Sequence, residues 1–218
     1  MKKLLIQERE ELEQKVRTHI ETLASAKEGL IHIGLPGGRS AASLIIGMLA
    51  LDDTLLKRIR LYLLDERLRG ELNSDTLLEA GLDKAIKQKR FALTSLVIPR
   101  VGKPLLENNE TQFDLVYLGV GEDGHVASLF PGSYPGTDTG QTSFVGNSPK
   151  PPSERVTFTY QGFLDHAHNS PIYLLFLGEG KREALKRLLS GKETAETLPC
   201  AFFTQQDFPV TIITDIEE

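Results

Sequence analysis

The sequence predicts an α/β protein of three layers, in which a mainly parallel sheet is covered by helices on both faces. Two observations support this fold class. Short apolar segments alternate along the chain with longer amphipathic ones, as strands alternate with helices in such proteins. Several short segments are apolar at consecutive positions, which indicates strands buried on both faces, as in parallel sheets.

The first half of the chain predicts helices and strands in turn. Leu12, Val16 and Ile20 recur at helical spacing and predict a helix over about residues 7–28, which Gly29 ends. The second helix is expected to begin at Ser40, whose hydroxyl suits an N-cap. The further expected segments are the strand 30–33, the turn 34–39, the helix 40–51, the strand 59–64 and the helix 76–89.

The second half continues this alternation. Residues 155–160 alternate between polar and apolar side chains and predict a strand with one exposed face. Residues 131–153 are rich in Pro, Gly, Ser and Thr, and we expect a long loop inside one domain. The other expected segments are the strands 96–98, 113–118, 172–177 and 210–214 and the helix 181–189.

The composition limits the classes of function. A hydrophobic share of 40% and a charged share of 25% are ordinary for a globular protein, and we expect residues 1–218 to form one domain. The net charge of −5 argues against nucleic acid or an anionic membrane as a partner. No signal peptide or membrane span is expected. With Cys200 as the only cysteine, the sequence predicts a cytoplasmic protein without disulfides.

Three unusual segments follow predicted strands, namely residues 34–40, 65–67 and 119–131. Ligands bind beyond the carboxyl ends of parallel strands, so we expect these segments to lie on one rim of the sheet. They therefore hold the candidate site residues.

The first segment contains Gly37, Gly38, Arg39 and Ser40 between a strand and a helix. Glycines let the backbone approach a ligand closely, and a helix N-terminus offers unpaired N–H groups to an anion. Arg39 adds a guanidinium that can bind phosphate. The alternative is a tight turn with a helix cap, and the P-loop pattern is absent.

The third segment contains Asp123 and His125. Residues 119–124, GVGEDG, have the spacing of a dinucleotide-binding turn, but Pro131 leaves no room for the long helix that such a site needs. A neutral imidazole at His125 can instead take a proton from water while Asp123 orients it. The alternative is a polar turn with a hydrogen-bonded histidine. No G-x-S-x-G occurs, so water is the expected nucleophile.

Asp65, Arg67 and Lys181 are weaker candidates. Asp65 and Arg67 follow a strand and can position a ligand hydroxyl or move a proton, and the alternative is a structural ion-pair network. Lys181 begins a helix and can reach an anion, and the alternative is a solvated lysine.

The other histidines predict no metal site. His166 and His168 lack a convincing third ligand. His32 lies inside an apolar strand and is expected in the core, whereas His19 is expected on a solvated helix face. We therefore expect neither a metal nor a cofactor.

Several segments together resemble one family. Residues 119–132, GVGEDGHVASLFPG, closely resemble the signature segment of 6-phosphogluconolactonases. Four shorter segments resemble further motifs of that family, and they occur in the same order: LPGGRS at 35–40, LDER at 64–67, SPKPPSERVTFT at 148–159 and GEGK at 178–181.

The resemblance implies a fold shared with glucosamine-6-phosphate deaminases and related sugar-phosphate isomerases. It also implies hydrolysis of 6-phospho-D-glucono-1,5-lactone in the oxidative pentose phosphate pathway, without a cofactor. His125 would activate water with support from Asp123. Arg39, Arg155 and Lys181 would bind the phosphate or the rest of the substrate, helped by the backbone of residues 37–40.

Two alternatives stay open. A deaminase resembles the chain at Asp65 and at residues 123–125, but it has a glutamate where this chain has Phe130, which favours the lactonase. The other alternative is a sugar-phosphate sensor without activity, and the presence of Asp123 and His125 argues against it. The chain departs from the family pattern at Ser40, after Arg67 and at Asp75, so the role of residues 68–75 in substrate binding is open.

Overall fold

A parallel sheet forms the centre of the molecule. The computed structural model describes residues 1–107, 111–136 and 140–217, except for the side chain of Arg39. Within these residues, seven strands pair in parallel in the order β1-β10-β9-β6-β2-β3-β5. These strands are β1 (Lys2–Leu5), β2 (Ile31–Leu35), β3 (Ile59–Leu63), β5 (Leu96–Val97), β6 (Leu115–Gly119), β9 (Ile172–Phe176) and β10 (Val210–Thr214).

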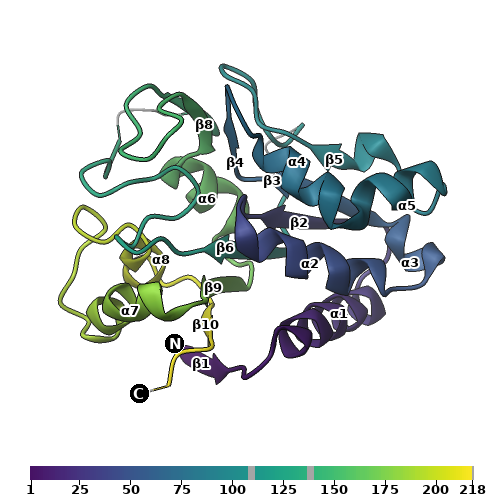
Figure 1. The fold of residues 1–218 in the computed structure, drawn as a ribbon, viewed down its shortest axis with the longest axis horizontal. Coiled ribbons are helices and arrows are strands. Elements are labelled where there is room, and N and C mark those ends of the chain that lie inside the picture. The colour runs from purple at the N-terminus through teal and green to yellow at the C-terminus, as the bar shows by residue number, and fades with distance from the viewer. Residues whose placement is uncertain (108–110, 137–139, 218) are drawn as a thin grey trace.

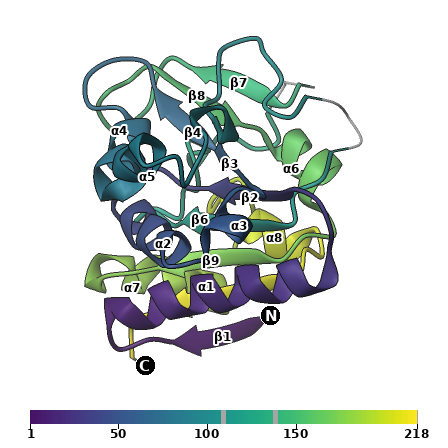
Figure 2. The same cartoon turned by 90° about the vertical axis from the view of Figure 1, so that its right-hand side faces the viewer.

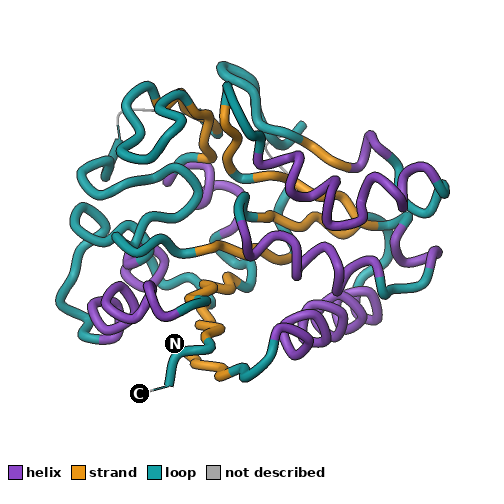
Figure 3. The backbone as a smooth tube through the Cα atoms, in the orientation of Figure 1, coloured by secondary structure: helices purple, strands orange, loops and turns teal. Residues whose placement is uncertain are grey.

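Helices cover both faces of this sheet, which confirms the predicted three-layer fold. Figure 1 shows α1, α2 and α5 on one side and α6, α7 and α8 on the other, and Figure 3 shows the strands between them. The first group is α1 (Arg9–Ala26), α2 (Arg39–Leu49), α3 (Asp53–Leu56), α4 (Asn73–Leu77), η1 (Leu78–Leu82) and α5 (Asp83–Lys87). The second is α6 (Tyr160–Ala167), η3 (Glu179–Lys181), α7 (Arg182–Leu189) and α8 (Ala201–Gln205), and η2 (Leu93–Ser95) precedes β5.

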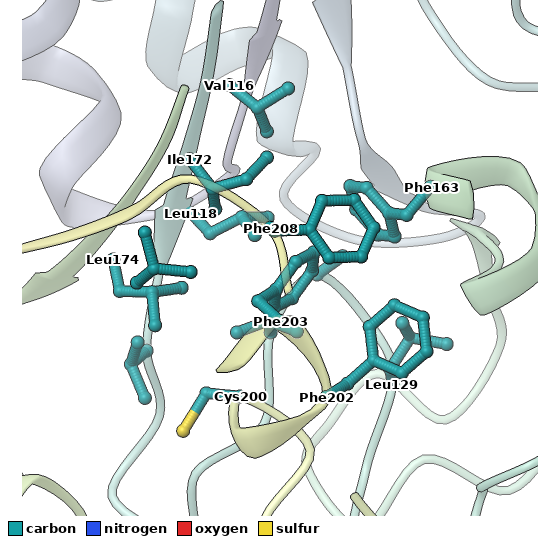
Figure 4. Close-up of a cluster of buried hydrophobic side chains, with 14 of the residues drawn as sticks. Val116, Leu118, Leu129, Phe163, Ile172, Leu174, Cys200, Phe202, Phe203 and Phe208 are labelled. Atoms are coloured by element: carbon teal, nitrogen blue, oxygen red, sulfur yellow. The ribbon is translucent and has the colours of Figure 1, made fainter. Parts of the chain in front are cut away.

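The central strand β6 shows why the sheet is buried on both faces. Leu115 and Tyr117 belong to the buried cluster under α1 and α2, whereas Val116 and Leu118 belong to the cluster under α6, α7 and α8. The second cluster also contains the aromatic rings of Phe163, Phe203 and Phe208 (Figure 4). Successive side chains of a strand point to opposite faces, so a continuous apolar run supplies both cores.

A smaller antiparallel sheet lies beside the carboxyl ends of the main strands, at the top of both ribbon views (Figures 1 and 2). It contains β4 (Asp65–Arg67), β7 (Thr142–Val145) and β8 (Arg155–Phe158), in the order β4-β8-β7. The prediction for residues 155–160 is therefore partly wrong. The strand exists, but all four of its residues are buried and it pairs outside the parallel sheet.

Other differences have local causes. The sequence does not predict β1, α3, α6, α8 or β7, most of which are too short to show a clear hydrophobic period. The helix expected over 76–89 begins at Asn73 and is interrupted at Gly81, where φ is 118°. The predicted cap at Ser40 is wrong: Gly38 is the N-cap, and Ser40 is the second residue of α2.

His19 is the histidine whose environment differs most from the expectation. It is half-buried, not solvated, and its Nδ1 lies 2.9 Å from the hydroxyl of Tyr117. Its ring stacks on Tyr173 at a centroid distance of 4.3 Å. Burial, followed by the charges of Lys15 and Lys2, lowers the pKa of His19 to about 4. His32 is hydrogen-bonded as expected, with Nδ1 2.8 Å from the hydroxyl of Tyr62, but it is half-buried and not in the core, so that part of the prediction is wrong.

The low pKa of His19 predicts a loss of stability in acid. Between pH 6.5 and about 4, the unfolded chain binds a proton at His19 and the folded protein does not, so stability falls as pH falls through this range. We expect a loss of about 1 kcal/mol between pH 7.5 and pH 5 from this group, allowing for its partial exposure. Urea unfolding of the wild type and of His19→Gln at both pH values measures this loss of stability. The variant should lose less stability in acid, and an equal loss in both proteins would contradict the assignment.

Candidate active site

A cavity of about 430 Å³, here called the rim cavity, opens beyond the carboxyl ends of β2, β6, β9 and β10. Its volume falls within the range of about 300–1,000 Å³ that is typical of small-molecule sites. The predicted site residues that line it are Gly37, Gly38, Ser40, His125 and Lys181. Two of the three predicted segments therefore meet here, together with the segment that follows β9.

The turn after β2 brings backbone N–H groups to the rim cavity. Gly38 caps α2 without a side-chain hydrogen bond, and the first N–H groups of a helix have no acceptor within the helix. A Cβ on Gly37 would lie 2.2 Å from the side-chain amide of Asn73, so only glycine fits at this contact. The Asn73 side chain also donates to the backbone oxygen of Asp65. This part of the site is therefore suited to hold an anion at the N-terminus of α2.

His125 and Asp123 form a hydrogen-bonded pair on the loop after β6. Nδ1 of His125 lies 2.5 Å from Oδ1 of Asp123, and the backbone N–H of His125 donates to the same oxygen at 3.4 Å. The His125 side chain is 17% exposed and lines the rim cavity. With Nδ1–H donating to Asp123, the other ring nitrogen, Nε2, is the one that can accept a proton.

Gly121 makes room for the imidazole. A Cβ at this position would lie 1.8 Å from Nδ1 of His125 and 2.7 Å from Oδ1 of Asp123. The ring of Phe130 also lies near the imidazole, with a centroid distance of 4.8 Å. The glycine therefore lets the backbone pass directly beside the pair, and an aromatic ring of the same loop packs near the imidazole.

The electrostatics keep Asp123 ionised. Burial alone would raise the pKa of Asp123. The hydrogen bond from His125 and the charges of His125 and Lys150 outweigh this effect of burial, so the pKa lies well below the usual range. Nζ of Lys150 lies 3.7 Å from Oδ1 of Asp123. Lys150 lies in the motif at residues 148–159, but nothing in the sequence distinguishes it as a site residue. Only the path of a loop 27 residues further on brings it to Asp123.

Asp65 and Arg67 do not line the rim cavity. Asp65 is buried and accepts a hydrogen bond from the hydroxyl of Ser128 at 2.8 Å, which links β4 to the loop that carries His125. Its pKa is raised, mainly by burial. Arg67 donates through Nη1 to the backbone oxygen of Glu71, and its buried Nε has no partner among the described residues. The binding roles of Asp65 and Arg67 stay predictions, and the side chain of Arg39 lies outside the described part of the structure.

Arg155 also lies outside the rim cavity, in a structural position. Its side chain is 8% exposed, and its guanidinium donates to the backbone oxygens of Lys150, Pro151 and Pro152 at 3.1–3.2 Å. The guanidinium carbon is 5.7 Å from the centre of the Phe130 ring. Arg155 thus holds the segment that carries Lys150, and it packs against the ring that contacts His125. Direct binding of phosphate by Arg155 stays a prediction.

Replacing Arg155 tests this structural role. We expect Arg155→Ala to lower the free energy of unfolding by about 2–4 kcal/mol. The substitution removes the hydrogen-bond donor of three backbone carbonyl groups and the positive charge 3.9 Å from Asp65. Urea unfolding measures the change. Arg69→Ala is the matched control: its exposed ion pair with Glu154 is worth less than about 1 kcal/mol. A loss of substrate affinity with unchanged stability would instead favour direct binding.

The described residues contain no group of three His, Cys, Asp or Glu side chains that could hold a metal ion. In the same part of the chain, no helix is both long enough and apolar enough to cross a membrane.

Comparison with known proteins identifies relatives of this chain. Residues 7–212 match the family described as "Glucosamine-6-phosphate isomerases/6-phosphogluconolactonase". A Caenorhabditis elegans protein that provisionally carries the name 6-phosphogluconolactonase is 31% identical over 209 residues, which cover 85% of this chain and 73% of the relative. The rat 6-phosphogluconolactonase is 46% identical over 91 residues, 41% of this chain and 33% of the rat protein.

A crystal structure of a Thermotoga maritima 6-phosphogluconolactonase has the same fold. It superposes with a TM-score of 0.74 and 22% identity, over 98% of both chains. The alignments with several other curated relatives span only about a third of those relatives' length.

Proposed function

Because the chain belongs to the family of glucosamine-6-phosphate isomerases and 6-phosphogluconolactonases, we propose that it hydrolyses 6-phospho-D-glucono-1,5-lactone to 6-phospho-D-gluconate, a step of the oxidative pentose phosphate pathway. The observation that carries this proposal is the pair of His125 and Asp123 at the rim cavity. Phe130, where the deaminases have a glutamate, supports the lactonase over the isomerase within this family.

The pair supports a mechanism with water as the nucleophile. Nε2 of His125 takes a proton from a water molecule as its oxygen attacks C1 of the lactone, which gives a tetrahedral oxyanion. The bond between C1 and the ring oxygen then breaks, and the imidazolium returns the proton to that oxygen. Asp123 keeps the imidazole in the required tautomer and stabilises its charged form. A six-membered lactone is reactive enough for this route without a metal or a covalent intermediate.

The surroundings of the pair support charge stabilisation and binding. Lys150 places a positive charge beside Asp123, and backbone N–H groups of the glycine-rich loop are candidates to stabilise the oxyanion. At the other segments, the α2 N-terminus and Lys181 are suited to the phosphate. Phosphate binding then orients the lactone carbonyl toward His125. The proposed reaction requires no cofactor. We also propose that the enzyme is cytoplasmic and that residues 1–218 form one catalytic domain.

The first experiment measures lactone hydrolysis directly. The lactone is generated in situ from glucose 6-phosphate, and its disappearance is followed by NMR with and without the protein, against the spontaneous rate. We expect acceleration. No acceleration by folded protein would contradict the proposal, and ammonia release from glucosamine 6-phosphate would then support the deaminase. Binding of 6-phosphogluconate without any turnover would support a sensor.

A further inference from the structure

The turn between β1 and α1 contributes a wall to the rim cavity that no sequence motif indicated. Gln7, Glu8 and Arg9 line the same cavity as His125 and Lys181. In Figure 2 this turn lies on the same side of the molecule as α7, which follows Lys181. Because β1 is an edge strand beside β10, its carboxyl end brings the start of α1 to the rim.

Arg9 is held in a defined position there. Its Nε donates to the hydroxyl of Ser43 at 2.7 Å, and Ser43 is a residue of α2 that is only 3% exposed. Among the described residues, the two terminal nitrogens of the Arg9 guanidinium have no hydrogen-bond or ion-pair partner. A buried hydroxyl thus fixes one edge of the guanidinium and leaves four N–H donors for a ligand.

The charged residues around Arg9 indicate which kind of ligand the guanidinium binds. Lys181 adds a second cation, and Glu8 and Asp215 are the acidic residues on the same cavity. Both carboxylate oxygens of Asp215 accept from the backbone N–H of Gly178, at 2.8 and 3.0 Å, so this charge is partly compensated by the protein itself. A guanidinium with two terminal nitrogens matches two oxygens of a phosphate group, which is a better fit than a single sugar hydroxyl.

We propose that Arg9 is a specificity residue that binds the phosphate group of the substrate and makes the enzyme select phosphorylated over unphosphorylated lactones. Ser43 is the positioning residue that aims the guanidinium. This inference rests on the proposed function for the identity of the substrate. The recognition of a phosphorylated sugar acid at Arg9 can be measured separately from the reaction.

The test compares two lactones. The kcat and KM are measured for 6-phosphogluconolactone and for glucono-1,5-lactone with the wild type, Arg9→Gln and Arg17→Gln. We expect Arg9→Gln to lower kcat/KM for the phosphorylated lactone about 10–100-fold, mainly through KM, and to leave the unphosphorylated lactone within about twofold. Arg17 is the matched control, since it also lies on α1 but pairs with Glu21 and is 52% exposed. Arg17→Gln should leave kcat/KM unchanged for both lactones.

A second measurement keeps the inference separate from the proposed function. Calorimetric titration with 6-phosphogluconate reports binding whether or not the protein hydrolyses lactones. We expect Arg9→Gln to weaken this binding about 10–100-fold, and Ser43→Ala to weaken it about 2–5-fold while the far-UV circular dichroism spectrum stays unchanged. Unchanged affinity and KM in a folded Arg9→Gln protein would overturn the inference and leave the proposed function intact. Equal losses for both lactones would also overturn it.

Discussion

We expect the His125→Ala variant to hydrolyse 6-phosphogluconolactone with a kcat about 10²–10⁴-fold below that of the wild type, the usual loss when a general base is removed. KM should change little, because the α2 N-terminus and Lys181 bind the far end of the substrate in this proposal. NMR detection of the lactone, corrected for spontaneous hydrolysis, measures the rate. His168→Ala is the matched control, since His168 is exposed and lies outside the rim cavity.

Removal of the imidazole also leaves a space beside Gly121 and Phe130. Added imidazole should therefore restore part of the lost rate in His125→Ala and have no effect on the wild type. Wild-type kcat in a folded His125→Ala protein would contradict the assignment of the base. The thermal unfolding midpoint of each variant, measured in the same buffer, shows whether a loss of rate comes from the chemistry or from unfolding.

The second large effect is expected for Asp123→Asn, with a kcat about 10–10³-fold below the wild type and an unchanged KM. An amide in place of the carboxylate can donate to Nδ1 of His125, which favours the tautomer with the proton on Nε2 and blocks proton transfer from water. The lost negative charge also destabilises the imidazolium that forms during the reaction. Because Asp123 is 34% exposed, water replaces part of its effect, so the loss is expected below that of His125→Ala.

Glu122→Gln is the matched control for this prediction. It makes the same change of charge one residue away, and the Glu122 side chain points toward Gly180 instead of His125. The pKa of Asp123 lies well below the usual range, so its carboxylate stays ionised across the working pH range of the assay. The shape of the pH–rate profile between pH 5 and 9 should therefore not report titration of Asp123. Equal rates for Asp123→Asn and Glu122→Gln would remove Asp123 from the mechanism.

The central sheet could be predicted because its signal is local. A run such as Leu115–Leu118 can supply two cores only if helices cover both faces, and that reasoning needs no distant residues. The sequence does not predict β7, the antiparallel partner of β8 in the small sheet, because residues 142–145 lie in the segment rich in turn residues that was expected to be a loop throughout. α8 is a single short turn held by packing of its phenylalanines.

The residues of the candidate site also fall into a group that the sequence predicts and a group that it does not. His125, Asp123 and Gly37 could be predicted as candidates because each lies in a segment that follows a predicted parallel strand, where topology alone places ligands. Lys150 and Arg9 could not, because their approach depends on the path of a loop and on an edge strand that the sequence does not reveal. Arg155 was identified through its motif, yet a motif does not distinguish a residue that touches substrate from one that holds the backbone nearby.

The walls of the rim cavity come from the chain in two different ways. Residues 119–130 carry the proposed catalytic pair, the glycine that makes room for it and the aromatic ring beside it, so the proposed chemistry depends on one continuous piece of chain. The proposed anion-binding wall is assembled from separate pieces, at the starts of α1 and α2 and after β9. We therefore expect mutations in the turn between β1 and α1 to shift the substrate range and to leave the chemical step unchanged. In this proposal, single substitutions far in sequence from residues 119–130 are enough to change specificity.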